Sequence, residues 1–178
     1  MGLLDSIEKY CYENNVKNEA ISSFFKSGFP TTRNEEWKYT SLKKVVSEDY
    51  QINKEEAEIT DEEIKKQSLN IGDKIVFING FLHKKPNIKG VTIENNFFEN
   101  LSFEDPITAL NSGLAEHGFK ISIDKNVAVE SPIEILFLNK YNTNSFVQFR
   151  NKIILNENAQ VKIVENIQNL SENLCFIN

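Results

Sequence analysis

The stretch Gly28-Phe-Pro-Thr-Thr-Arg-Asn-Glu-Glu-Trp-Lys-Tyr-Thr-Ser-Leu42 is the most informative part of this chain of 178 residues. It contains the one Trp of the chain, Trp37, and one of its two Arg residues, Arg33. The stretch has neither the spacing of a metal site nor that of a phosphate-binding glycine loop or a nucleophile turn. It therefore has to be interpreted together with its neighbours.

The residues before this stretch predict helices. Apolar side chains recur at three- and four-residue steps over residues 3–28, and Asn14-Asn15 is a point where two helices could separate. Gly28 suits the backbone angles found after a helix, and Pro30 prevents the helix from continuing. A loop and a short helix are expected to follow.

Trp37 has two interpretations. A Trp beside Arg33 and Lys38 has the composition of an interface hot spot, whereas a lone Trp in a helical unit more often packs in the core of that unit. We favour the core, with Trp37 and Leu42 facing inward. The charged side chains of the stretch are then expected at the surface: Arg33, Glu35, Glu36 and Lys38.

The middle of the chain changes from polar and acidic to apolar. Residues 47–66 read as an acidic linker, with a capping box at Thr60-Asp-Glu-Glu63 that predicts the start of a helix. Ile75-Val-Phe-Ile78 predicts a strand, Asn79-Gly80 is typical of a two-residue hairpin turn, and Val91-Thr-Ile93 predicts a further strand.

A last helix is expected to begin at Asp105-Pro106, because Asp caps free amide groups and Pro fits the first helical position. Its buried residues would be Ile107, Leu110 and Leu114, and Gly118 would end it. The segments after Gly118 predict strands: Phe119–Ile123, Ile133–Leu138, Phe146–Phe149, Lys152–Leu155, Val161–Val164 and a beginning strand in 171–178.

A weak internal repeat runs through these strands. Ile123-Asp-Lys-Asn-Val127 and Leu155-Asn-Glu-Asn-Ala159 lie 32 positions apart, and each joins a strand end to an Asn-rich turn. Short strands with recurrent turns suit a solenoid or a sandwich, and two copies do not separate these options.

Four sequence motifs, taken together, resemble those of one protein family. They are the Pro-Thr-x-Arg-x-Glu-x-Trp-Lys-Tyr-Thr motif of residues 30–40, Val76-Phe-Ile-Asn-Gly80, the Asp-Pro-x-x-Ala-Leu-Asn motif of residues 105–111, and the pair Ser131-Pro-Ile-Glu-Ile135 and Arg150-Asn-Lys-Ile-Ile154. In this order they are similar to the scaffold subunits of Suf iron–sulfur cluster assembly, and to the D subunit (SufD) in particular.

The resemblance implies an α+β fold: an N-terminal helical region with a small strand insertion, followed by the first turns of a right-handed β-helix (solenoid). The expected domains are 1–118, helical and mixed, and 119–178, the start of the β-helical core. Family members continue through more β-helix into a helical end that docks an ATPase, so the chain is expected to be an N-terminal portion.

The implied function is that of a non-catalytic scaffold that pairs with a sister scaffold subunit and an ABC-type ATPase in the cytoplasm. The related B-type scaffold subunit stays open as an alternative, as does the choice between a homodimer and a heteromer. A second class is a stand-alone interaction module that uses the acidic residues of 48–66, among them Glu55, Glu56 and Glu58. An enzyme that cleaves polysaccharides on a solenoid face is the least favoured alternative.

The charge distribution and the hydrophobicity of the chain agree with a scaffold protein of the cytoplasm. The net charge is −6, and residues 48–66 hold eight acids against three lysines, so no basic stripe favours nucleic acid. No apolar run is long enough to cross a membrane and no secretory signal is evident, which makes the cytoplasm the default.

Iron–sulfur ligation requires several thiolates or imidazoles close together. The chain has two Cys and two His, at positions 11, 175, 83 and 117, and no pair is closely spaced. Cys11 and Cys175 are expected to be isolated thiols. We assign no catalytic, cofactor-binding or metal-ligating residue, and we expect the full complex rather than this chain to handle the cluster.

Overall fold

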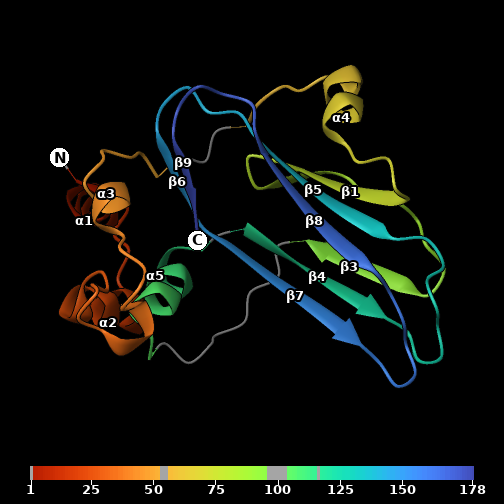
Figure 1. The fold of residues 1–178 in the computed structure, drawn as a ribbon, viewed down its shortest axis with the longest axis horizontal. Coiled ribbons are helices and arrows are strands. Elements are labelled where there is room, and N and C mark those ends of the chain that lie inside the picture. The colour runs from red at the N-terminus through yellow and green to blue at the C-terminus, as the bar shows by residue number, and fades with distance from the viewer. Residues whose placement is uncertain (1, 53–55, 96–103, 116) are drawn as a thin grey trace.

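The computed structural model describes residues 2–52, 56–95, 104–115 and 117–178. In this part of the chain, most helices gather at one side and most strands at the other, while one helix (Asp61–Gln67) lies on the strand side (Figure 1). The helices are α1 (Leu3–Glu13), α2 (Glu19–Ser27), the 3₁₀ helix η1 (Glu35–Trp37), α3 (Lys43–Val46), α4 (Asp61–Gln67) and α5 (Pro106–Leu114). The strands are β1 (Asp73–Ile78), β2 (Phe81–Lys84), β3 (Val91–Asn95), β4 (His117–Ile123), β5 (Ile133–Asn139), β6 (Ser145–Val147), β7 (Phe149–Leu155), β8 (Ile163–Asn169) and β9 (Cys175–Ile177).

The two N-terminal helices separate where the sequence predicted. Asn15 takes a positive φ of 52°, and α2 restarts at Asn18, whose side chain accepts a hydrogen bond from the amide of Ile21. Gly28 ends α2 with a φ of 69° and a ψ of −173°, which is a conformation open essentially to glycine alone. The division into two helices is thus confirmed, and its cause is local backbone chemistry.

Helices α1, α2 and α5 share an apolar cluster with one strand. Helix α2 lies against α5 because Gly113 leaves room for it: a Cβ at that position would meet Ile21 at 3.0 Å. The buried members of the cluster are Leu3, Ile7, Cys11, Ile21, Phe24, Tyr50, Ala109, Leu110, Leu114 and Phe146. Since Phe146 lies in β6, the cluster joins the helical side to the stacked strands.

The end of α5 was predicted wrongly. The helix begins as expected, with the Asp105 carboxylate accepting from the amide of Thr108 at 2.8 Å. It stops at Leu114, because Ala115 is extended, and Gly118 lies inside β4. Pairing of β4 with β7 begins at His117. His117 and Gly118 therefore belong to the sheet, although the sequence pattern placed them at the end of the helix.

The Asn79-Gly80 turn joins β1 and β2 as a hairpin. Both residues have positive φ, 48° and 89°, and Ile78 pairs directly with Phe81. This is the geometry that two-residue hairpin turns need, so the turn prediction is confirmed.

The strands after residue 116 stack in parallel on strands about 30 residues later. β4 pairs with β7 from His117↔Phe149 to Ile123↔Leu155, β5 with β8 from Ile133↔Ile163 to Asn139↔Asn169, and β6 with β9 from Ser145↔Cys175 to Val147↔Ile177. We call β4, β5 and β6 the first strand triplet and β7, β8 and β9 the second. Figure 1 shows the triplets running side by side across the molecule.

The weak repeat of the sequence lies at equivalent turns of the two triplets, between β4 and β5 in the first and between β7 and β8 in the second. Asn126 and Asn158 both have positive φ, 60° and 58°, and the Asn158 Nδ2 donates to the Asn126 Oδ1 at 3.0 Å. The Lys125 ammonium pairs with Glu157 beside them. Asn is tolerated in left-handed conformations, which explains why the repeat is recognisable at its turns.

The opposite side of the stack is closed by antiparallel strands. β2 pairs with β1 and β3 pairs with β4, whereas β1 joins β5 in parallel. The mixed α and β architecture predicted from the sequence is confirmed. The right-handed β-helix stays a prediction.

Candidate functional site

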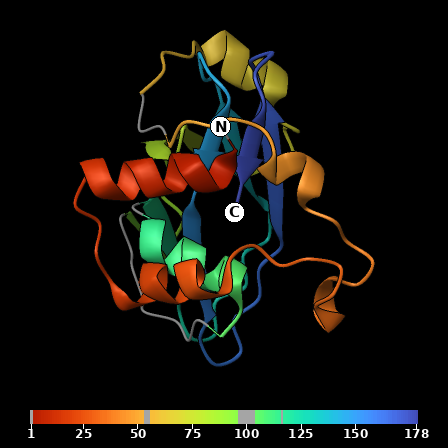
Figure 2. The ribbon, with the colours of Figure 1, turned by 90° about the vertical axis from the view of Figure 1, so that its left-hand side faces the viewer.

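The motif-bearing stretch of residues 31–41, which we call the arm, projects from the body of the molecule (Figure 2). Most of its hydrogen bonds are internal: the Thr31 amide donates to the Asn34 Oδ1 at 2.9 Å, and the Thr40 amide donates to the Trp37 carbonyl at 2.9 Å. Tyr39 of the arm is 91% exposed. Arg33, Glu35, Glu36 and Lys38 are exposed, as predicted.

The prediction that Trp37 packs in the core is wrong. Trp37 is partly exposed and joins none of the three apolar clusters formed by the described residues. The 3₁₀ turn η1 holds it on the arm, where it borders a hollow that includes Pro30 and Asp105. The structure therefore leaves the interface interpretation of Trp37 as the one with physical support.

A second candidate surface is the free side of the second strand triplet. Within the described residues, β7, β8 and β9 are each the last strand of their sheet. Ile121, Ile123 and Phe137 of the first triplet are at most 4% exposed, but their aligned partners Ile153, Leu155 and Ile167 are 41%, 51% and 53% exposed. Positions that are core in one triplet are open in the next because none of the described strands pairs beyond the second triplet.

We call this free side, defined by Ile153, Leu155 and Ile167, the open edge. Its strands present backbone donors and acceptors together with apolar side chains, which is the arrangement to which another strand can add. Sequence reasoning found the strands, but their spacing alone does not tell which neighbour each strand has.

The acidic segment is tied to the body at several points. Tyr50, Ile59 and Ile64 are buried, and Gln51 bridges to Ser145 of β6. Its acids face outward: Glu48, Asp49, Glu56, Glu58, Asp61 and Glu62 are exposed, while Glu55 lies outside the described residues. The capping box at Thr60 is confirmed, with the Thr60 amide donating to Glu63 at 2.8 Å. Hydrogen bonds from Thr60, chiefly from its amide, lower the pKa of Glu63.

A buried carboxylate that sequence reasoning missed joins this segment to the sheet. Glu134 of β5 is 0% exposed and accepts from the Ser68 hydroxyl at 2.6 Å, the Leu69 amide at 2.9 Å and the Asn166 Nδ2 at 2.8 Å. Burial by itself raises the pKa of Glu134, but these three hydrogen bonds, helped by the Lys74 charge, lower it overall. Glu134 thus stays ionised and fixes the end of α4 against β5 and β8.

A second missed network fixes α5 to the strands. Arg150, the other Arg of the chain, donates from Nη2 to the Asn111 Oδ1 at 2.7 Å and to the Ser112 Oγ at 2.8 Å. The Asn111 Nδ2 donates in turn to the carbonyls of Phe149 and Asn178. The Asn of the Asp-Pro-x-x-Ala-Leu-Asn motif is therefore a structural residue that holds a helix to a strand.

The cysteines and histidines lie apart. Cys11 is buried in α1 and Cys175 lies in β9, and both are free thiols. Burial raises the pKa of Cys11, and it raises that of Cys175 to about 11, so both are protonated near neutral pH. His83 is exposed on β2, and His117 packs against the Phe81 ring. The described residues contain no group of three His, Cys, Asp or Glu side chains placed to hold a metal.

Among the described helices, none is both long and apolar enough to cross a lipid bilayer. No curated protein matches the chain. Residues 5–85, which run from α1 through the arm to the end of the β1–β2 hairpin, match the family model described as the SufBD protein N-terminal region. This match supports the SufB/SufD family for the chain without distinguishing between the two subunit types.

Proposed function

We propose that this chain is a non-catalytic scaffold component of Suf-type iron–sulfur cluster assembly, of the D type, acting in the cytoplasm. The match of residues 5–85 to the SufBD N-terminal region carries the proposal. The partners would be a sister scaffold subunit and an ABC-type ATPase. The D type is preferred over the B type on the arm motif and on the Asp-Pro-x-x-Ala-Leu-Asn helix.

The architecture supports a role based on shape. Parallel strands stacked in register form a rigid platform, and the open edge offers a place where further strands add within the complex. We propose that the stack is the beginning of a right-handed β-helix, consistent with parallel pairing at intervals of 30 to 32 residues. The platform would then bring subunits into register around the cluster, which is the cargo of the complex.

The direct test is co-purification. A tagged chain is co-expressed with the B-type scaffold and the ATPase from the same cells, and with each of them alone. We expect retention of the B-type scaffold, and weaker retention when Leu155 and Ile167 are both changed to Glu, because charges on an edge oppose strand addition. Tyr12→Glu is the matched control: Tyr12 is 89% exposed on α1, away from the edge.

The cofactor expectation has its own test. The isolated chain is expected to hold no stoichiometric iron–sulfur cluster after anaerobic reconstitution, since Cys11 and Cys175 lie on different elements with raised thiol pKa values. A chelator-resistant cluster absorbance at one per chain would contradict this part of the proposal.

The second candidate function is a stand-alone interaction module. The outward-facing acids of the 48–66 segment favour it, because their side chains remain available to a basic partner. Replacing Glu55, Glu56 and Glu58 by Gln would abolish partner binding in that case, whereas the scaffold proposal expects these changes to leave co-purification with the B-type subunit unchanged.

A further inference from the structure

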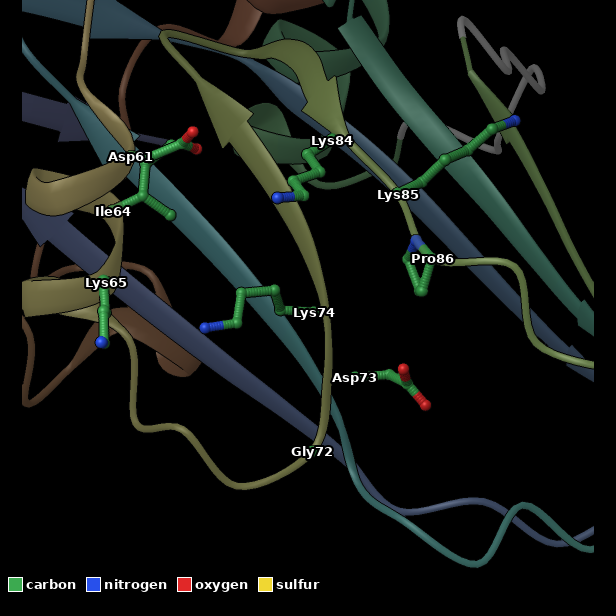
Figure 3. A pocket seen from close by; sticks show the side chains of 9 residues that line it. All are labelled: Asp61, Ile64, Lys65, Gly72, Asp73, Lys74, Lys84, Lys85 and Pro86. Atoms are coloured by element: carbon green, nitrogen blue, oxygen red, sulfur yellow. The ribbon is translucent and has the colours of Figure 1, made fainter.

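A cavity of about 390 Å³ lies between α4 and the start of the β1–β2 hairpin, and neither the scaffold proposal nor the family match uses it. Figure 3 shows the side chains that line it. They are Asp61, Ile64, Lys65, Gly72, Asp73, Lys74, Lys84, Lys85 and Pro86. Four of these nine residues are lysines, in a chain whose net charge is −6.

Three elements bring three ammonium groups to the same side. On β1, Lys74 lies two residues before Val76, which faces α4 and packs in a cluster with Ile64. Lys84 of β2 pairs with Val76, so it lies on the same face of the hairpin. Lys65 comes from α4. Figure 3 shows the Lys74 and Lys84 side chains extending from the strands toward α4.

The other charged residues of the lining divide between the two sides. The Lys85 Nζ donates to the Ile93 carbonyl at 3.1 Å, and in Figure 3 Lys85 and Asp73 extend away from the α4 side. Asp61 is the carboxylate that shares the α4 side with the lysines. Inside the cavity, lysines therefore outnumber carboxylates.

The three lysines differ in their partners. The Lys74 Nζ donates to the Ser68 Oγ at 2.6 Å, and Ser68 donates to the buried Glu134, so Lys74 is held in place with a counter-charge behind it. Within the described residues, neither Lys65 nor Lys84 has an ion-pair partner. Two unpaired cations beside a third, on a partly enclosed surface, attract an anion.

We propose that this cavity binds the phosphate or pyrophosphate group of a small anionic ligand, with Lys65, Lys74 and Lys84 as the contacting residues. Lysine binds phosphate as a point charge with several donors, and about 390 Å³ is within the range of small-ligand sites. An extended acidic polypeptide fits less well, because the exposed carboxylates of Asp61 and Asp73 also line the cavity and would repel it along its length.

The probe is inorganic pyrophosphate, titrated into the full chain by isothermal calorimetry at 20 mM and 200 mM salt. We expect binding that weakens with salt, since the contacts are charged and partly exposed. Lys84→Gln and Lys65→Gln are each expected to weaken binding by about tenfold, the loss of one charge-assisted hydrogen bond. Asp61→Asn is expected to tighten it, because it removes a facing negative charge.

Lys44→Gln is the matched control, since Lys44 is exposed on α3 and does not line the cavity. It removes one positive charge and should leave the affinity unchanged. The proposal is overturned if no binding is detected at 20 mM salt, or if Lys44→Gln weakens binding as much as Lys84→Gln. Citrate that binds as tightly as pyrophosphate would overturn the assignment to phosphate. Circular dichroism of each variant shows that the fold is retained.

Discussion

The arm and the stacked strands differ both in sequence and in burial. The arm holds the chain's most distinctive residues, yet Trp37 joins no described apolar cluster and Tyr39 is almost fully exposed. The strands have a plain apolar composition and only a weak repeat, yet they contain fully buried side chains such as Ile121 and Ile135. The unusual residues of the arm therefore lie at the surface of this protein, whereas the repeated strands contribute to its core.

The largest effect is expected from Phe137→Ala. Phe137 is 4% exposed, and its ring lies 5.2 Å from that of Phe77 and 5.3 Å from that of Phe149, centroid to centroid. Truncation leaves a cavity between three strands and should lower the free energy of unfolding by about 3–5 kcal/mol. Urea unfolding measures this free energy. The control is Phe25→Ala, because the Phe25 side chain on α2 is 38% exposed. Equal losses in both variants would remove the contrast between core and surface.

Glu134→Gln should follow in size. The carboxylate of Glu134 accepts three hydrogen bonds. A Gln side chain would replace one accepting oxygen by an NH₂ group, which would then face a hydrogen-bond donor. We expect a loss of about 2–3 kcal/mol at pH 7, measured by urea unfolding. A loss below about 0.5 kcal/mol would show that Glu134 does not fix α4 to the sheet.

The same residue predicts a pH dependence. The pKa of Glu134 is lowered by folding, so its stabilisation is present above its ordinary value of 4.5 and is lost as the pH falls through the folded value. The wild-type chain should therefore lose stability below pH 4.5 more steeply than Glu134→Gln does. Thermal unfolding of both between pH 7 and pH 3 checks this, and parallel curves would contradict it.

A smaller effect is expected at the turn between β7 and β8. Asn158 has a φ of 58° and bonds to Asn126 through its side chain. Asn158→Ala should cost about 1–2 kcal/mol, because alanine is strained at this φ. Asn158→Gly keeps the backbone conformation and should cost less. If Gly is as destabilising as Ala, the side-chain bond rather than the backbone determines the cost.

The smallest effect is expected from Trp37→Ala. Since Trp37 lies on the arm and joins no apolar cluster of the described residues, its truncation should change the free energy of unfolding by no more than about 0.5 kcal/mol. The emission maximum of Trp37 in the folded wild-type chain should lie close to that in the unfolded chain. A strongly blue-shifted emission would restore the core interpretation.

Local chemistry made many elements predictable. The caps at Asp105 and Thr60 and the hairpin turn at Asn79-Gly80 appear where the sequence placed them, because each depends on residues within four positions. The end of α5 was not predictable in this way: Gly118 looks like a helix stop, but its position is decided by a strand 32 residues away.

The candidate surfaces also differ in how far the sequence could predict them. The arm could be found from sequence because its composition is unusual, although its exposure could not. The Glu134 network and the lysine cavity were not visible, since each joins residues from separate elements. The exposed side chains of the open edge could not be picked out either, because strand order is not written in the sequence. Lys74 and Lys84 become neighbours only through the pairing of β1 with β2.

The sequence by itself determined the helices and turns of this protein, its α and β composition and its resemblance to the Suf scaffolds, because short-range caps, turn residues and apolar periodicity are written in neighbouring positions. Only the tertiary structure decided which apolar residues are covered, where Trp37 lies and which charges meet. Burial and pairing depend on contacts between residues distant in the chain, and the weak repeat in the sequence specifies neither how the strands pair, at intervals of 30 to 32 residues, nor what lies on the last of them.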